Sequence, residues 1–255
     1  MRNKILKLAV LAMASTAIIS QSASAISVDI NLTDPDSASY QWGNYAAEYN
    51  YSVGGINLAV TGYSYTNGRI RQDAVGNWES WGNEYGLGVE YSRYPDHALD
   101  NSRGDYDMLL LSFDEAVSLD SISSGWRYSG SRSSEASIMA YGGDGAYDSF
   151  IGKQWSDLLS DEWEGIGDYR IDSLNAPEAV NQGGFMSRYW LVGAYNSTLN
   201  LDDEVGTSFS SGNDFWKLKG VSVSVNPVPL PGSLVLFGSA LMIFGSLRRK
   251  KAVKA

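Results

Sequence analysis

The sequence predicts an all-β protein, a single β-sandwich or jelly-roll-like domain with one short helix. Short runs of alternating, β-branched or aromatic residues recur along the middle of the chain, and clusters of Gly, Asn, Asp and Ser separate them. The chain has 255 residues, of which 44% are hydrophobic, and this is enough to bury a sizeable core. No repeat of fixed period and no long linker interrupts the pattern, so we expect one domain over residues 26–226.

The expected strands differ in the clarity of their patterns. Residues 26–32 and 215–225 alternate most clearly between apolar and polar side chains. Residues 108–113 form an apolar run that only Ser112 interrupts, which fits a strand that is buried on both faces. A further strand over 117–122 is expected after a turn. The complete set of expected strands is 26–32, 56–65, 108–113, 117–122, 136–141, 168–171, 188–195 and 215–225.

One segment has a helical pattern instead. Between Phe150 and Trp163, the apolar residues Ile151, Trp155, Leu158 and Leu159 recur at helical spacing. We therefore expect a short helix there.

The N-terminal residues 1–25 have the three parts of a secretory signal peptide. Arg2, Lys4 and Lys7 precede the apolar run 8–19, and Ala23-Ser24-Ala25 provides small residues for cleavage. Cleavage after Ala25 by the Sec export machinery would start the mature chain near Ile26. The alternative is an uncleaved membrane anchor.

The C-terminal residues 227–255 contain a Pro motif, an apolar stretch and a basic tail. Pro229, Leu230, Pro231 and Gly232 lead into a short transmembrane helix at about 232–247. Arg248 and Arg249 open the basic tail 248–255, which is expected to stay in the cytoplasm while the body lies outside.

This tripartite C-terminus resembles the PEP-CTERM sorting signal of exosortase-dependent bacterial surface proteins, in the Val-Pro-Leu-Pro variant. The resemblance implies an inner-membrane intermediate, processing by an exosortase near the Pro motif, and delivery to the cell surface or extracellular matrix.

Segments of the body are similar to blocks of the same family. These segments are 95–101, 105–114, 117–119, 125–126, 187–196 and 213–218, so the resemblance extends over about residues 78–250. It implies a surface or matrix component without an assigned enzymatic activity.

Charge and composition exclude several classes of function. The segment between the two terminal signals holds 11 basic residues and all 29 acidic ones, a net charge of −18, which argues against nucleic-acid binding. The absence of Cys excludes disulfides, thiolate nucleophiles and Cys-ligated metals, and a single His excludes a multi-His metal centre.

An acidic loop, Asp96–Asp107, is the main candidate metal site. Asp100, Asn101, Asp105 and Asp107 offer the carboxylate and amide oxygens that calcium prefers. In the alternative interpretation these residues are turn formers whose side chains bind local backbone N–H groups. A weaker calcium candidate is the Gly-rich segment 142–148, for which a hairpin turn is the alternative.

Three hypotheses of function follow. The first is an exported structural or interaction protein without catalytic activity. The second is a glycan-binding module that uses aromatic side chains, with or without calcium; core packing is the alternative role of those side chains, which are Trp42, Trp78, Trp81, Tyr85, Tyr91 and Tyr94. The third, ranked last, is a hydrolase of matrix polysaccharide. The sequence has no Gly-x-Ser-x-Gly nucleophile elbow, so we expect His97 to brace the acidic loop and not to act in a catalytic triad.

Overall fold

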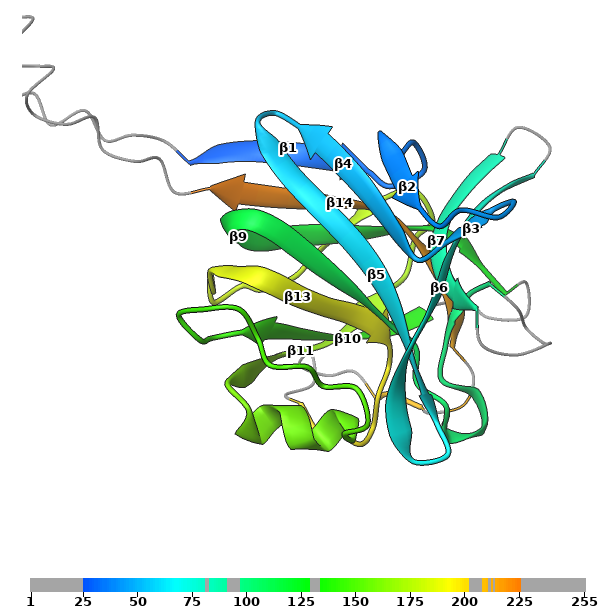
Figure 1. Ribbon diagram of the computed structural model, residues 1–255, viewed down its shortest axis with the longest axis vertical. Helices are drawn as coiled ribbons and strands as arrows, with labels where there is room; N and C mark the ends of the chain where they lie inside the picture. Colours follow the sequence, from blue (N-terminus) through cyan, green and yellow to red (C-terminus); the bar gives the residue numbers. More distant parts are fainter. Residues whose placement is uncertain are drawn as a thin grey trace, which may run out of the picture. The chain divides into compact units, whose positions relative to one another are not determined.

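The computed structural model describes residues 25–80, 83–90, 97–128, 134–201, 208–210, 212 and 214–225. Within these residues the regular secondary structure is mostly β-strand, and the predicted all-β class is confirmed (Figure 1). The strands are β1 (Ile26–Asn31), β2 (Ser37–Ser39), β3 (Tyr45–Ala46), β4 (Glu48–Val53), β5 (Ile56–Thr66), β6 (Arg69–Ser80), β7 (Asn83–Glu90), β8 (Leu99–Asp100), β9 (Met108–Arg127), β10 (Ser134–Tyr141), β11 (Trp163–Ile171), β12 (Pro177–Ala179), β13 (Ser187–Ala194) and β14 (Phe215–Val225). Two 3₁₀ helices are η1 (Ser102–Gly104) and η2 (Trp155–Ser160).

Hydrogen bonding links these strands in the order β11-β10-β13-β9-β14-β7-β6-β5-β4-β2. An additional pairing of β5 with β9 closes part of this order into a circuit through β9, β14, β7, β6 and β5. The remaining strands attach at its sides: β1 and β8 pair with β14, β12 pairs with β9, and β3 pairs with β6.

Strand β9 connects the two halves of this circuit, because different parts of it pair with different strands. Its first residues, Met108–Phe113, pair with β5 and β13, whereas residues 118–127 pair with β14. The predicted turn between two strands is therefore wrong, because the chain continues as one strand of 20 residues. A register shift opposite β13 leaves residues 114–116 exposed, and such a bulge bends a strand without ending it.

Two hydrophobic cores lie on opposite faces of β9 and its neighbours. The main core contains alternating side chains such as Leu58, Leu111 and Val223. The second core contains Leu110 and Leu191, and the segment after β10 covers it with Phe150, Trp155 and Leu158. Residues 108–113 therefore have buried side chains on both faces, as their apolar run predicts.

The predicted helix is shorter and tighter than its pattern suggested. Only Trp155–Ser160 is helical, as a 3₁₀ helix with a capping box between Gln154 and Asp157. Trp155 and Leu158 are buried, but Ile151 and Leu159 are exposed. A single 3₁₀ stretch of six residues cannot turn all four apolar side chains toward the same core.

Both ends of the described fold meet in one strand pair. Strand β1 begins at Ile26, and its register with β14 places Ile26 opposite Val225 (Figure 1). Ala25 is exposed and precedes the first strand. The predicted signal-peptide residue Ala23 and the whole predicted sorting segment lie outside the described residues. No helix among the described residues is long and apolar enough to cross a membrane.

Candidate functional site

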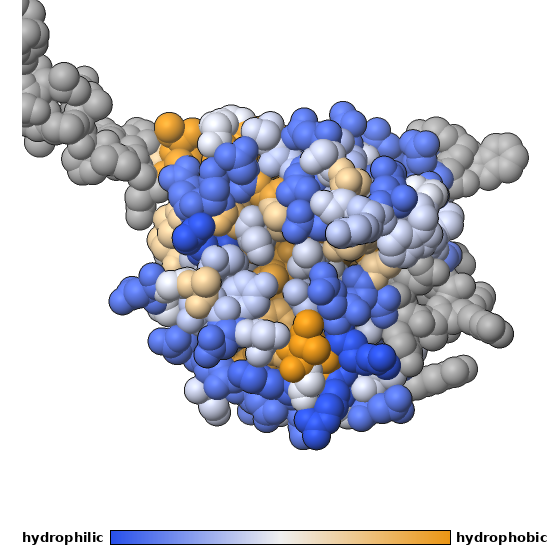
Figure 2. All heavy atoms as spheres, in the orientation of Figure 1, coloured by the Kyte–Doolittle hydropathy of each residue, from blue (hydrophilic) through white to orange (hydrophobic). Residues whose placement is uncertain are grey.

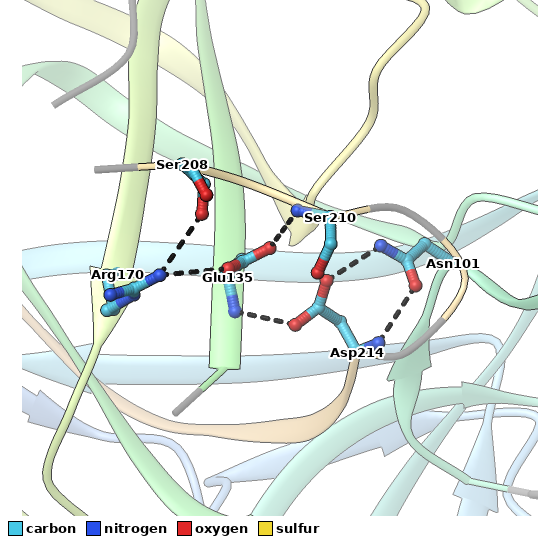
Figure 3. A network of polar contacts seen from close by, with 6 residues as sticks. All are labelled: Asn101, Glu135, Arg170, Ser208, Ser210 and Asp214. Carbon is cyan, nitrogen blue, oxygen red and sulfur yellow. Dashed lines mark hydrogen bonds and ion pairs between the residues drawn. The ribbon is translucent and has the colours of Figure 1, made fainter. Parts of the chain in front are cut away.

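The acidic loop is held by Asn101, whose side chain is the centre of a buried polar network (Figure 3). Its amide oxygen accepts hydrogen bonds from the backbone N–H groups of Gly212 and Asp214, at 3.0 and 2.9 Å. Its amide nitrogen donates to the Tyr195 carbonyl and to Asp214 Oδ2, at 2.9 and 2.8 Å. Asn101 is only 1% exposed, so all its bonding capacity is used inside the protein.

Glu135 and Arg170 extend the network to β10 and β11. The Glu135 backbone N–H donates to Asp214 Oδ1 at 2.8 Å, and Glu135 Oε2 accepts from the Ser210 N–H at 2.8 Å. Arg170 pairs with Glu135 at 3.4 Å and also donates to the Ser208 carbonyl (Figure 3). These contacts fasten the residues before β14 onto the sheet.

Burial changes the acidity of the carboxyl groups in this region. Desolvation raises the pKa of Asp214 to about 7, although the hydrogen bond from the Glu135 backbone N–H opposes this shift. Desolvation and the neighbouring charge of Asp100 raise the pKa of Asp107 well above its ordinary value. Asp107 is therefore a buried carboxyl group whose charged form is disfavoured, and not an exposed ligand.

The four predicted calcium ligands lie near one another but have different roles. Asp100 Oδ1 accepts hydrogen bonds from the backbone N–H and the hydroxyl of Ser102, at 2.9 and 2.8 Å, which is the turn-forming role. Asn101 belongs to the polar network, Asp107 is buried, and Asp105 is half-buried. The described residues contain no group of three or more His, Asp or Glu side chains placed to hold a metal ion. Asp96 lies outside the described residues, and the calcium site stays a prediction.

His97 opens the described part of this loop and belongs to an aromatic cluster with Trp42, Tyr45 and Trp78. Its ring stacks on Trp78 with centroids 4.0 Å apart, and its Nδ1 is hydrogen-bonded to the Tyr45 hydroxyl. Trp42 stacks on Tyr45 and is 53% exposed. The cluster fixes the start of the loop, as expected for a bracing histidine.

Lys217 on β14 contacts this cluster, and it was not among the candidate site residues expected from the sequence. Its ammonium group donates to the His97 carbonyl and lies 5.8 and 5.6 Å from the ring centroids of Trp78 and Trp126. It is 5% exposed, and desolvation lowers its pKa to about 7. Nothing in the local sequence distinguishes Lys217 from a surface lysine, because its partners lie far away in the chain.

Of the aromatic residues proposed for glycan binding, the structure brings together only Trp42 and Trp78. Tyr85 lies on β7 and is half-buried, and Trp81, Tyr91 and Tyr94 fall outside the described residues. Trp78 contacts His97 and Lys217, so Trp42 is the most accessible of the three rings that the structure describes, which are Trp42, Trp78 and Tyr85.

Comparisons with known proteins give no relative for this arrangement. No family model matches the chain, and neither the curated proteins nor the solved structures contain a match.

Proposed function

We propose that the chain is an exported bacterial surface or extracellular-matrix protein, sorted by an exosortase, which acts as a structural or interaction module and not as an enzyme. The proposal includes a signal peptide over 1–25, a β-sandwich body of the jelly-roll kind, and a transmembrane sorting helix at about 232–247. The composition of the two termini is its main basis in the sequence.

The pairing of Ile26 with Val225 is the structural observation that supports it most directly. Strand β1 starts at Ile26, directly after the proposed cleavage site, and β14 ends at Val225, four residues before Pro229. Removal of residues 1–25 and processing near the Pro motif would therefore leave every described strand intact.

The basic tail provides the test of sorting. Deletion of residues 248–255 is expected to retain the chain in the inner membrane, because the positive charges hold the helix in its sorting orientation. As a control, Arg248→Lys with Arg249→Lys keeps the charge and should preserve that orientation. Immunolabelling of intact cells and membrane fractionation give the readout, and surface display unchanged by the deletion contradicts the proposal.

Glycan binding is the second candidate, and the exposure of Trp42 favours it. Its ring is supported by Tyr45 and open to solvent, so it offers a rigid apolar surface beside polar groups. A polysaccharide pull-down with and without calcium tests it directly.

Hydrolysis of matrix polysaccharide ranks last. A hydrolase needs an accessible carboxyl group with a raised pKa. The pKa values of Asp107 and Asp214 are raised by desolvation, but these groups are 4% and 2% exposed and face the interior.

A further inference from the structure

A groove of about 460 Å³ crosses five adjacent strands, β2, β4, β5, β9 and β13. It lies on the face of the sheet turned away from the main core, since Tyr51, Leu58 and Phe113 alternate into that core. The groove shares no lining residue with the polar network or the aromatic cluster. On the face drawn in Figure 2, hydrophobic residues appear as separate small patches among hydrophilic ones.

One row of cross-strand partners forms the floor of the groove. Ser37 lies opposite Asn50, Asn50 opposite Ala59, Ala59 opposite Ser112, and Ser112 opposite Tyr189. Directly opposite residues of antiparallel strands project to the same face, so this row runs perpendicular to the strands. Its small side chains leave the depression open. Five strands spaced about 4.8 Å apart give it a length of roughly 19 Å.

Aromatic rings close one end of the row. The Tyr189 ring lies 4.9 Å from Tyr147 and 6.0 Å from Tyr141, between centroids. Tyr141 lines an adjoining pocket of about 200 Å³ together with Trp163, its partner on β11. Glu162 in the same pocket adopts the left-handed φ of 64° and accepts a hydrogen bond from the Tyr141 hydroxyl at 2.8 Å. The groove therefore leads toward an aromatic pocket with polar walls.

Polar side chains along the rim determine what can bind. Asn57 donates to Asp114 from its backbone and its side chain, at 3.0 and 2.7 Å. The exposed Arg188 places its guanidinium over the Tyr189 ring, 5.7 Å from the ring centroid. Strands β4, β5, β9 and β13 are each paired on both sides, and β2 is the outermost described strand of the row, so a ligand that lies across these strands must be held by side chains. This argues against a peptide strand added within the groove, because a strand is added at an unpaired sheet edge. It favours a ligand rich in hydroxyl groups.

The charge of the lining residues further restricts the class of ligand that can bind. Groove and pocket together carry five acidic residues and two basic ones, namely Asp36, Asp114, Asp148, Asp161 and Glu162 against Arg188 and Lys153. A polyanion would be repelled by this surface.

We propose that the groove binds an extended, neutral polysaccharide, which lies across the strands and stacks a sugar ring on Tyr189. The apolar C–H face of a pyranose ring fits an aromatic side chain, and its hydroxyls fit the rim. This inference names a ligand class and a site for the proposed interaction module, and it does not depend on Trp42.

The test measures binding of neutral hexose oligosaccharides of increasing length, and of a polyuronate, to the full chain purified in detergent. Affinity should increase with length until the groove is filled. Ala59→Trp fills the floor and should weaken binding by at least about tenfold, equivalent to 1.4 kcal/mol. Ala179→Trp, an exposed position on β12, is the matched control and should bind as the unmodified chain does.

Asn57→Ala is a second variant that removes a rim group without adding bulk, and thermal unfolding checks that each variant is folded. The proposal is overturned if the folded chain binds no neutral oligosaccharide, or if it binds the polyuronate more tightly than the neutral oligosaccharides. It is also overturned if Ala59→Trp and Asn57→Ala bind as the unmodified chain does, or if Ala179→Trp weakens binding as much as Ala59→Trp. Localisation is measured separately, so a chain that is displayed but does not bind contradicts the groove alone. A chain that binds but is not exported contradicts the sorting alone.

Discussion

Asn101 joins parts of the protein that are more than a hundred residues apart in sequence. Asn101→Ala would leave the Gly212 N–H, the Asp214 N–H and the Tyr195 carbonyl without their side-chain partner. Since each buried unsatisfied polar group costs about 1–3 kcal/mol, we expect a loss of more than about 2 kcal/mol in the free energy of unfolding. Denaturant unfolding measures it, with Asn83→Ala at an exposed position as the control. Equal stability of the two variants contradicts the structural role of Asn101.

Asp214 and Lys217 predict how stability depends on pH. The pKa of Asp214 rises from 3.8 to about 7 on folding, through desolvation, so the folded state keeps a proton that the unfolded chain loses in this window. Stability therefore decreases as the pH rises from 3.8 to about 7. Desolvation lowers the pKa of Lys217 from 10.5 to about 7, so stability increases again from about pH 7 to 10.5.

Together these two groups give a stability minimum near neutral pH. Asp214→Asn should reduce the decrease on the acidic side, to which the raised pKa of Asp107 also contributes, and Lys217→Met should flatten the alkaline side. Melting temperatures across this range are the measurement. A profile in which neither substitution changes its own side would show that these groups do not titrate as buried residues.

Gly88 illustrates a backbone contact that only glycine permits. A Cβ at this position would overlap the His97 carbonyl and lie 2.8 Å from the Ala98 Cα. Gly88→Ala should therefore destabilise the protein by about 1–3 kcal/mol, as overpacking does elsewhere. Gly183→Ala is the matched control, because nothing lies within 4 Å of the added carbon. If both variants unfold at the same denaturant concentration, β7 and the loop are not as close as described.

The calcium prediction can be tested in the acidic loop. A site specific to the folded state would add about 2.7 kcal/mol at 100 times its dissociation constant. The melting temperature in millimolar calcium would then exceed that in EDTA by several degrees, and Asp105→Ala would abolish the difference while Glu115→Ala would not. An identical melting temperature in both conditions leaves these residues with the roles described above, in turns and in the polar network.

At the scale of elements, the short helix η2 covers one side of the second hydrophobic core. Trp155 is fully buried and donates its indole N–H to the Tyr106 carbonyl at 3.1 Å. Trp155→Ala should cost about 3–5 kcal/mol, the usual range for removal of a large buried aromatic side chain. Leu159→Ala, on the exposed side of the same helix, should change stability by less than about 0.5 kcal/mol. Similar losses in both variants would mean that η2 does not cover the second core.

The elements also show which sequence patterns were sufficient to predict a strand and which were not. The alternation in 215–225 predicted β14 with its observed bounds, because one face is buried and the other is not. The hairpin of β6 and β7 was missed, since its strands contain Gly76, Gly86 and Gly88 among many polar residues and lack a regular alternation. The bend in β9 was read as a turn, because exposed polar residues at 114–115 look the same locally in a bulge and in a loop.

The candidate sites were less predictable than the strands. The acidic loop was recognised from its composition, but the burial of Asp107 and the engagement of Asn101 by Asp214 depend on tertiary contacts. The groove depends on the registers of five strands, of which β2 and β4 were not expected at all. Local patterns report which face of a strand is apolar, and they carry no information on which strands become neighbours.

At the scale of the whole molecule, the first and last strands of the described fold pair with each other. Because β1 pairs only with β14 among the described strands, and their outer ends are Ile26 and Val225, the two proposed targeting segments attach at the same strand pair. Export and sorting could then act on both ends without opening the main core.

The most direct test of this account is to determine both ends of the chain recovered from the cell surface by mass spectrometry. The account predicts an N-terminus at Ile26 and a C-terminus near Pro229–Gly232, with the basic tail removed. A chain that is found in the cytoplasm and retains Met1 and Ala255 would contradict the central claim. A surface chain that begins at Ile26 but keeps residues 248–255 would contradict processing by an exosortase.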